Sequence, residues 1–171
     1  MIRNNPKRFL AVDVRPRRFG FALFERPSRL LDCGVARFQS AGRAAIRIGS
    51  FIAAFHPELL ILRKFAEHSR RNTAGARRVM KAVGRQARRV AVRVVFVSER
   101  RVRNTFQQKR KITKRQIAAS LASMFPELGW KLPPQRKPWQ SEHPRMAMFD
   151  AVSLAVAYAT THQTGQSTEC H

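Results

Sequence analysis

The N-terminal part of the chain contains, at residues 9–25, the run FLAVDVRPRRFGFALFE. Residues 9–14 and 19–25 of this run are mostly apolar, and a short polar segment with a proline separates them. Short apolar runs bounded by such turn signals predict two buried strands. A third strand is predicted at residues 30–38, and three strands at this spacing indicate an antiparallel meander. Asp13 interrupts the first strand, which makes it the first candidate for a functional residue.

The rest of the chain alternates between helical and strand-like apolar patterns. The predicted elements are a helix over residues 40–55, a strand over 58–62, a helix that begins after Thr73, a strand over 90–97, a helix over 113–125, a loop over 129–144 and a helix over 145–161. This order predicts an α/β fold with a mixed five-stranded sheet flanked by helices. The last helix is apolar nearly all round, so we expect it to be buried between other elements. We expect a single domain over residues 1–162 and a polar C-terminal tail over residues 163–171.

The charge of the chain is strongly positive. Lys and Arg number 34 against 10 Asp and Glu, which gives a formal net charge of +24. Such an excess repels itself in the folded state, and a polyanionic partner relieves that cost. We therefore predict nucleic acid as the partner, with an anionic membrane surface as the main competing interpretation.

Other features of the sequence bear on where the protein works. No apolar run approaches the ~18 residues of a transmembrane helix, and no signal-peptide pattern precedes the first strand. The two cysteines, Cys33 and Cys170, belong to no zinc-binding pattern, and a disulfide framework is not expected in a chain of this length. We expect a reducing cytoplasmic setting without a membrane partner, in association with the nucleoid.

The chain has three aspartates, and two of them lie in apolar surroundings. Asp13 interrupts the first strand and Asp150 interrupts the most apolar helix, whereas Asp32 does neither. A carboxylate in such a place is costly unless it is paired, hydrogen-bonded or bound to a metal. One interpretation is a salt bridge to one of the many arginines. The other is a metal site, because metal-dependent phosphodiester hydrolysis needs carboxylate oxygens that converge from separate elements on divalent ions such as Mg²⁺.

Both aspartates lie in stretches that resemble a known family. Asp13 is followed seven positions later by Gly20, with Arg17 between them, and this pattern resembles the first-strand signature of RuvC-type Holliday-junction resolvases. The run FDAVSLAVA, which contains Asp150, resembles the last helix of that family. Two further stretches resemble the family in the expected order, namely PELLIL at residues 57–62 and VRNTFQQKRKITKRQI at residues 102–117.

The resemblance implies a ribonuclease-H-like fold and an endonuclease that acts on branched or structured DNA in recombination and repair. It implies that Asp13 and Asp150 are catalytic residues and ligands of Mg²⁺ or Mn²⁺. Because RuvC-type resolvases are dimers, it also implies a homodimer.

The sequence departs from the family pattern at the metal site. Arg63 stands where the family has a glutamate at the end of the fourth strand, and Ala147 stands one turn before Asp150 where the family has an aspartate. An arginine in that place repels Mg²⁺ and can pair with the remaining aspartates instead. Three residues are candidates to replace the missing ligands, although each is also compatible with an ordinary surface position: Glu67, Glu142 and His143.

Basic residues concentrate in the middle of the chain. Residues 63–115 hold 19 of the 34 Lys and Arg but only two acidic residues, Glu67 and Glu99. Guanidinium groups suit phosphate geometry, so we expect this stretch to contact phosphate, with a solvated linker as the competing interpretation. The candidate nucleic-acid-binding residues are Arg17, Arg63, Arg77, Arg78, Arg103, Lys109, Arg110, Lys111, Lys114 and Arg115. Three aromatic residues could stack on unpaired bases or simply pack against the domain: Phe106, Trp130 and Trp139.

These observations leave three functional hypotheses. The first is a metal-dependent endonuclease on branched DNA that uses Asp13 and Asp150. The second is a catalytically impaired DNA- or RNA-binding module that keeps the fold and loses hydrolysis. The third is a basic protein associated with RNA or the ribosome. The direction of Arg63 separates the first two, because a guanidinium that points into the site neutralises a carboxylate that the metal needs.

Overall fold

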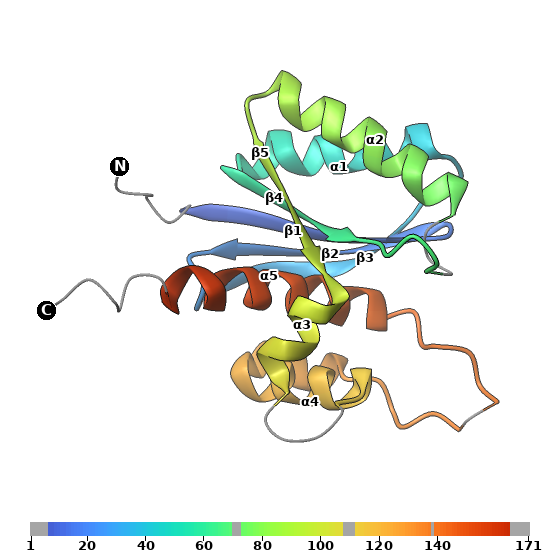
Figure 1. The fold of residues 1–171 in the computed structure, drawn as a ribbon, viewed down its shortest axis with the longest axis vertical. Helices are drawn as coiled ribbons and strands as arrows, with labels where there is room; N and C mark the ends of the chain where they lie inside the picture. The colour runs from blue at the N-terminus through green and yellow to red at the C-terminus, as the bar shows by residue number, and fades with distance from the viewer. Residues whose placement is uncertain (1–6, 70–72, 108–111, 138, 165–171) are drawn as a thin grey trace, which may run out of the picture.

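The structure is a computed structural model that describes residues 7–69, 73–107, 112–137 and 139–164. The elements in chain order are β1 (Arg8–Arg15), β2 (Arg18–Glu25), β3 (Leu30–Arg37), α1 (Ala41–Phe55), β4 (Leu59–Lys64), α2 (Ala74–Arg89), β5 (Arg93–Ser98), α3 (Glu99–Phe106), α4 (Lys114–Met124), a short 3₁₀ helix (Pro126–Lys131) and α5 (Met146–Thr164). Helices α1 and α2 cover one face of a central sheet and α5 covers the other, with α3 and α4 on the far side of α5 (Figure 1).

The sheet has the strand order β3-β2-β1-β4-β5. Strands β1, β2 and β3 form the predicted antiparallel meander, and β4 and β5 run parallel to β1. The prediction of a mixed five-stranded sheet flanked by helices is therefore confirmed. Strand β1 lies at the centre of the sheet with helices over both faces, which explains why its sequence is almost continuously apolar.

Alternation along the strands separates two hydrophobic cores. In β1, Phe9 and Ala11 belong to the core beneath α5, whereas Leu10, which lies between them, belongs to the core beneath α1 and α2. Because side chains alternate with a period of two, Asp13 and Arg15 continue the row that faces α5. The same alternation in β4 places Arg63 on that face. The sequence thus aims three charged side chains of the central strands at α5.

The last helix lies between the sheet and helices α3 and α4, as the figure shows (Figure 1). Residues 146–159 of α5 are all buried, which confirms the prediction from its apolar sequence. Gly20 permits the close contact of this helix with β2, since a Cβ at that position would lie 1.8 Å from the carbonyl oxygen of Ala147. Gly20 is also the register partner of Asp13 on β1. The glycine of the first-strand signature therefore brings the first turns of α5, with Asp150, over Asp13.

Side-chain caps fix where the helices begin. Ser40 and Thr73 accept hydrogen bonds from the backbone of the first turns of α1 and α2. Thr113 and Gln116 form a capping box at the start of α4. His56 ends α1 in the left-handed conformation, at a φ of 47°.

The structure differs from the predicted elements in several places. Helix α3 was not predicted, because its sequence is mostly charged and buries only Val102. The short 3₁₀ helix begins before the predicted loop and extends into its first residues. Strand β5 begins three residues later than predicted, after a turn in which Ala91 has a φ of 56°. Helix α5 extends to Thr164, and residues 165–171 of the predicted tail lie outside the described residues.

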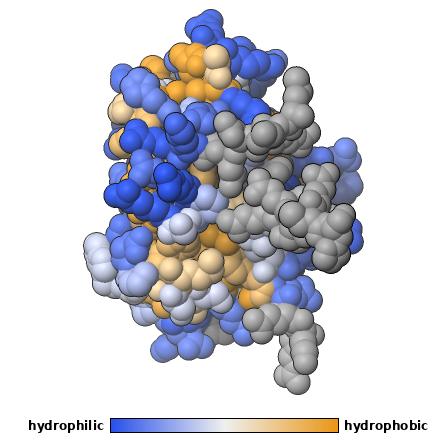
Figure 2. Space-filling view, turned by 90° about the vertical axis from the view of Figure 1, so that its left-hand side faces the viewer, coloured by the Kyte–Doolittle hydropathy of each residue, from blue (hydrophilic) through white to orange (hydrophobic). Residues whose placement is uncertain are grey.

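The surface is mostly hydrophilic, with some exposed apolar side chains. On the face seen in Figure 2, hydrophilic residues surround smaller apolar areas. The large apolar residues exposed in the described part of the chain are Leu31, Ile46, Val90, Phe96, Met124, Trp130 and Trp139. Within the same residues, no helix combines the length and apolarity that crossing a membrane requires.

Candidate active site

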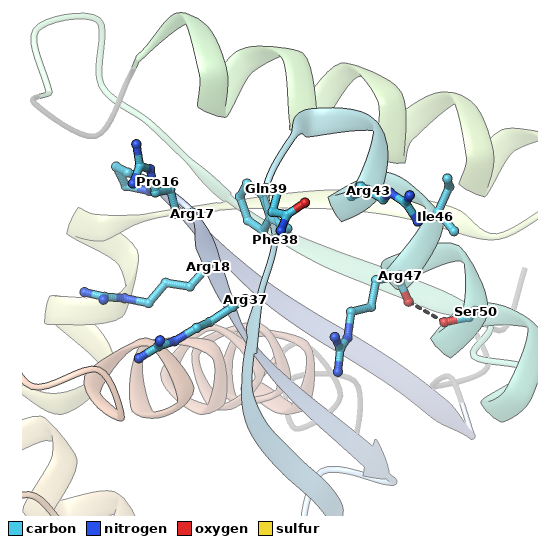
Figure 3. A pocket seen from close by; sticks show the side chains of 10 residues that line it. All are labelled: Pro16, Arg17, Arg18, Arg37, Phe38, Gln39, Arg43, Ile46, Arg47 and Ser50. Atoms are coloured by element: carbon cyan, nitrogen blue, oxygen red, sulfur yellow. Dashed lines mark hydrogen bonds between the residues drawn. The ribbon is translucent and has the colours of Figure 1, made fainter.

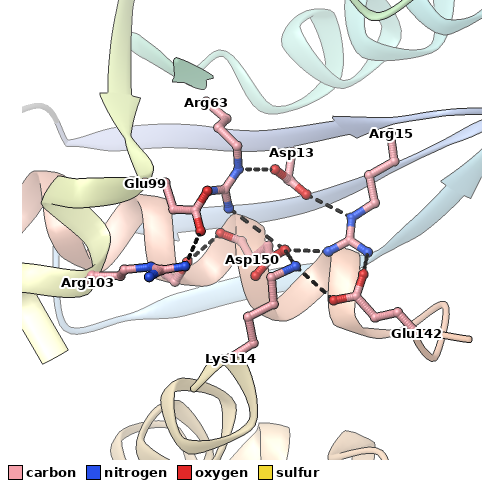
Figure 4. Close-up of polar contacts among 9 residues, drawn as sticks. Asp13, Arg15, Arg63, Glu99, Arg103, Lys114, Glu142 and Asp150 are labelled. Atoms are coloured by element: carbon pink, nitrogen blue, oxygen red, sulfur yellow. Dashed lines mark hydrogen bonds and ion pairs between the residues drawn. The ribbon is translucent and has the colours of Figure 1, made fainter. Parts of the chain in front are cut away.

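The two aspartates of the sequence pattern meet at the ends of β1 and β4, beneath the first turns of α5. Asp13 is fully buried and Asp150 is 8% exposed. Both carboxylates contact the guanidinium groups of Arg15 and Arg63, so they face the same small volume (Figure 4). The structure therefore brings together the residues that were predicted to share a site.

Arg15 connects three carboxylates. Its Nε donates to Oδ2 of Asp13 at 3.0 Å, and its two terminal nitrogens donate to Asp150 and Glu142. The side chain is almost fully enclosed, with 5% of the residue exposed. A guanidinium with five donors in a fixed plane is suited to hold carboxylates that approach from different elements. Arg15 thus ties the end of β1 to α5 and to the loop that precedes it.

Arg63 provides a second guanidinium at the same place. Its Nε donates to Oδ1 of Asp13 at 2.5 Å, and its Nη2 lies 3.8 Å from Oδ2 of Asp150. Arg63 is 4% exposed, so it points into the site and not toward solvent. This finding confirms that the arginine at the family's glutamate position pairs with the aspartates. It also corrects the expectation that Arg63 contacts phosphate at the surface.

A lysine completes the charge balance of the site. Lys114, the first residue of α4, places its Nζ 2.8 Å from Oε1 of Glu142 and 3.6 Å from Oδ2 of Asp150. The cluster therefore contains three positive groups and three carboxylates in mutual contact (Figure 4). We call these six residues the arginine-carboxylate cluster: Asp13, Arg15, Arg63, Lys114, Glu142 and Asp150.

The environment keeps both guanidinium groups charged. Burial by itself lowers the pKa of Arg15, but Asp150, Asp13 and Glu142 outweigh it and raise that pKa above its usual value. Burial likewise lowers the pKa of Arg63, and Asp13 and Asp150 again raise it above the usual value. Neither arginine can lose its proton to make room for a cation.

The ionisation of Glu142 makes the stability of the cluster depend on pH. Burial raises its pKa, but the hydrogen bond from Lys114 and the charge of Arg15 outweigh burial and lower the pKa below the ordinary 4.5. A lowered pKa in the folded state means that the ionised group stabilises the fold above the unfolded pKa, and that this contribution disappears as pH falls through the folded pKa.

Glu142→Gln should therefore destabilise the protein at neutral pH, and the difference from wild type should shrink as pH falls below about 4.5. Urea unfolding of both proteins at a series of pH values measures this convergence. A difference that stays constant from neutral pH down to strongly acidic pH would show that Glu142 does not act through its charge.

The residues present do not fit a magnesium site. Mg²⁺ is bound by carboxylate oxygens and retained water, but both oxygens of Asp13 accept hydrogen bonds from guanidinium groups. The two arginines and Lys114 add positive charge where the ion would need negative charge. Within the described ranges, no three His, Cys, Asp or Glu residues form a group that could hold a metal ion.

The candidate replacement ligands lie in different places. Glu142 joins the arginine-carboxylate cluster, where it pairs with Arg15 and Lys114. Its neighbour His143 is half-buried, and its Nδ1 accepts a hydrogen bond from the backbone N–H of Arg145. Glu67 is exposed in the loop after β4.

Five of the ten predicted phosphate-binding residues lie at the surface. Those that are exposed in the structure are Arg17, Arg77, Arg78, Arg103 and Arg115. Arg103 pairs with Glu99 at 2.7 Å, and Arg115 donates to the carbonyl oxygen of Pro133. Lys114 is half-buried in the cluster. Lys109, Arg110 and Lys111 lie outside the described residues.

The predicted stacking residues differ in exposure. Trp130 and Trp139 are 74% and 77% exposed, so they do not pack into the domain. Lys131 lies 5.3 Å from the ring centre of Trp130, and Lys137 lies 5.4 Å from that of Trp139. Phe106 packs against the core beneath α5.

Arg15 is the functional residue that the sequence reasoning missed. The signal was present, since a residue two positions after Asp13 on a strand points to the same face. The many arginines of the chain hid it, because only the fold tells which of them is enclosed.

Comparison with solved structures identifies the fold. The structure of RuvC from Thermus thermophilus matches with a TM-score of 0.71 at 16% identity, over 92% of this chain and 96% of that protein. RuvC from T. thermophilus in complex with Holliday junction substrate matches with a TM-score of 0.69 at 17% identity and the same coverage. The complex of Fowlpox virus resolvase with substrate Holliday junction DNA matches with a TM-score of 0.59 at 10% identity, over 90% of this chain and 99% of that protein.

Comparisons of the sequence with models of protein families and with curated proteins find no match. At these low identities the likeness rests on the fold. The chain therefore has a RuvC-like, ribonuclease-H-like fold, a mixed five-stranded sheet flanked by helices.

Proposed function

We propose that the protein binds branched DNA and that the arginine-carboxylate cluster does not hydrolyse it. The observation that carries this proposal is the double guanidinium contact of Asp13, by Arg15 on one oxygen and by Arg63 on the other. The carboxylates at this place need positive charge beside them, and the guanidinium groups of Arg15 and Arg63 provide it.

The proposal of nucleic acid as partner rests on charge and on the structural neighbours. The net charge of +24 favours a polyanion. Two of the neighbours with the same fold are complexes with Holliday junction DNA. We therefore favour branched DNA over RNA as the ligand. The homodimer and the cytoplasmic, nucleoid-associated location stay predictions.

A Mg²⁺-dependent endonuclease is the second candidate. The retention of both Asp13 and Asp150 on the central strand and the buried helix favours it. It requires Arg15 and Arg63 to leave the carboxylates, which means breaking buried ion pairs. Such pairs are costly to break, so the geometry supports the binding function better.

Binding to a four-way DNA junction should depend strongly on salt and not on divalent ions. Phosphate contacts release counterions, so log K should fall with log salt at a slope of about −0.9 for each phosphate neutralised on duplex DNA. We expect the same affinity in EDTA and in Mg²⁺ at matched ionic strength. Fluorescence anisotropy with a labelled junction measures both.

A junction of RNA and vesicles of anionic lipid serve as comparison ligands in the same titration. Tighter binding to either of them than to the DNA junction would contradict the proposed partner. An affinity for the DNA junction that requires Mg²⁺ would contradict the proposed role of the arginines.

A further inference from the structure

A second basic feature lies beside the arginine-carboxylate cluster, at the same end of the sheet. A hollow of about 1050 Å³ opens between the β1–β2 turn, the end of β3 and the start of α1. Five arginines line it, and its lining residues in the described part of the chain include no Asp or Glu (Figure 3). We call it the arginine hollow, after Arg17, Arg18, Arg37, Arg43 and Arg47.

The arginines of the hollow differ from those of the cluster in their partners. Arg15 and Arg63 are enclosed and neutralised by carboxylates. Within residues 7–69, 73–107, 112–137 and 139–164, none of the five arginines of the hollow forms a salt bridge. The Nε of Arg18 is buried without any hydrogen-bond partner in those residues. The hollow therefore presents positive charge that the described residues do not neutralise.

A row of arginines connects the hollow with the cluster. In the register of the sheet, Arg15 is paired with Arg18 across β1 and β2, and Arg18 is paired with Arg37 across β2 and β3. Side chains at paired positions point to the same face, and neighbouring strands are about 4.8 Å apart. Figure 3 shows Arg18 and Arg37 side by side, extending toward α5. The row thus spans about 10 Å from the buried cluster to the open hollow.

This arrangement is unfavourable for the protein alone. Like charges at directly paired positions of a sheet destabilise it. The first turn of α1 contains no acidic residue and carries Arg43, although the N-terminus of a helix favours negative charge. Multiple phosphate groups would relieve both costs, because guanidinium groups bind phosphate through paired donors. The exposed side chain of Ile46 and the half-buried ring of Phe38 add apolar surface to the same hollow.

We infer that the arginine hollow binds the phosphates of a second segment of the nucleic acid whose first segment lies over the arginine-carboxylate cluster. This inference rests on the proposed function, and it assigns the ligand contact to a surface outside the cluster. Because the arginines of the cluster are already neutralised internally, the hollow supplies the free guanidinium groups that grip the second segment.

The test compares two triple variants of equal charge. In the first, Arg37, Arg43 and Arg47 in the hollow are replaced by glutamine. In the second, three exposed arginines at the C-terminal end of α2 are replaced in the same way: Arg85, Arg88 and Arg89. Each protein is titrated with a four-way DNA junction and with a linear duplex as long as one arm, and circular dichroism verifies its fold.

The hollow variant should bind the junction at least roughly tenfold more weakly than wild type, and its salt slope should fall by about 2–3 units, since each lost phosphate contact removes about 0.9. Its loss on the one-arm duplex should be smaller, because that ligand provides no second segment. The α2 variant should lose only a little affinity, and about equally for both ligands. Equal losses for the two variants on the junction would overturn the inference while leaving the proposed function intact, whereas a wild type that fails to bind the junction would refute the proposed function itself.

A free polyphosphate is the alternative source of the same ligand chemistry. Inorganic tripolyphosphate is therefore titrated into wild type and into the hollow variant by calorimetry. Binding by wild type that the hollow variant lacks, combined with unchanged junction affinity of that variant, would assign the hollow to a free polyphosphate and overturn its assignment to a second segment. Tripolyphosphate that competes with the junction on wild type, but not on the hollow variant, supports the inference.

Discussion

Replacing Asp13 by asparagine is expected to lower the free energy of unfolding by about 3–5 kcal/mol, the range for removing one partner of a buried ion pair. The carboxylate is fully buried and accepts hydrogen bonds from Arg15 and Arg63. Asparagine has nearly the same shape, so the change removes charge and leaves two buried guanidinium groups facing one fewer carboxylate. Urea unfolding measures the loss.

Two further variants show whether charge causes that loss. Asp32→Asn makes the same chemical change at an exposed position of β3 and should change the unfolding free energy by less than about 0.5 kcal/mol. The double variant Asp13→Leu, Arg63→Met removes a positive and a negative group together, and it should recover part of the stability, since apolar replacement of a whole buried pair is often tolerated. If Asp13→Asn is as stable as wild type, the ion pairs of Asp13 with the arginines do not stabilise the fold.

Gly20→Ala is expected to destabilise the protein by about 3 kcal/mol, at the upper end of the range for overpacking a core. A Cβ at Gly20 would lie 1.8 Å from the carbonyl oxygen and 2.1 Å from the carbonyl carbon of Ala147. Both are backbone atoms of a buried helix, so α5 must move away from β2. Since α5 carries Asp150, the movement should also separate Asp150 from Arg15 and Arg63.

Gly84→Ala in α2 is the matched control for this substitution. The nearest atom to a Cβ at Gly84 is the end of the flexible Arg88 side chain, at 4.0 Å. Alanine in a helix interior should stabilise the protein by roughly 0.5–1 kcal/mol. Thermal unfolding of both variants makes the comparison, and a Gly20→Ala protein with the melting temperature of wild type would contradict the close packing of α5 on β2.

The sequence was sufficient to predict the layered fold and the meeting of two aspartates. Short apolar runs bounded by turn signals located all five strands. Asp13 and Asp150 were recognisable because each interrupts a buried element. The signature glycine was visible as a pattern, but its reason was not. Gly20 contacts Ala147, which is far from it in sequence, and no local propensity reports such a contact.

The remaining features depend on the register and on tertiary packing. Helix α3 has too few apolar residues to produce a helical pattern, and it forms because Ser98 caps it and Val102 anchors it. The arginine row became visible only when the strand register paired Arg15 with Arg18 and Arg18 with Arg37. In a chain with 34 basic residues, composition cannot distinguish an internal counter-charge from a surface ligand contact.

The most direct test of the central claim is a cleavage assay on a four-way DNA junction with wild-type protein in Mg²⁺ or Mn²⁺, with binding measured in the same samples. Three variants are assayed beside it. They are Asp150→Asn, Arg63→Glu, which replaces one internal counter-charge by a carboxylate, and the combination of the two. We predict that wild type binds the junction and leaves it intact, and that any weak cleavage by Arg63→Glu disappears when Asp150 is also replaced. Metal-dependent cleavage by wild type that Asp150→Asn abolishes would contradict the account, because it would require the arginines to yield the carboxylates to the metal.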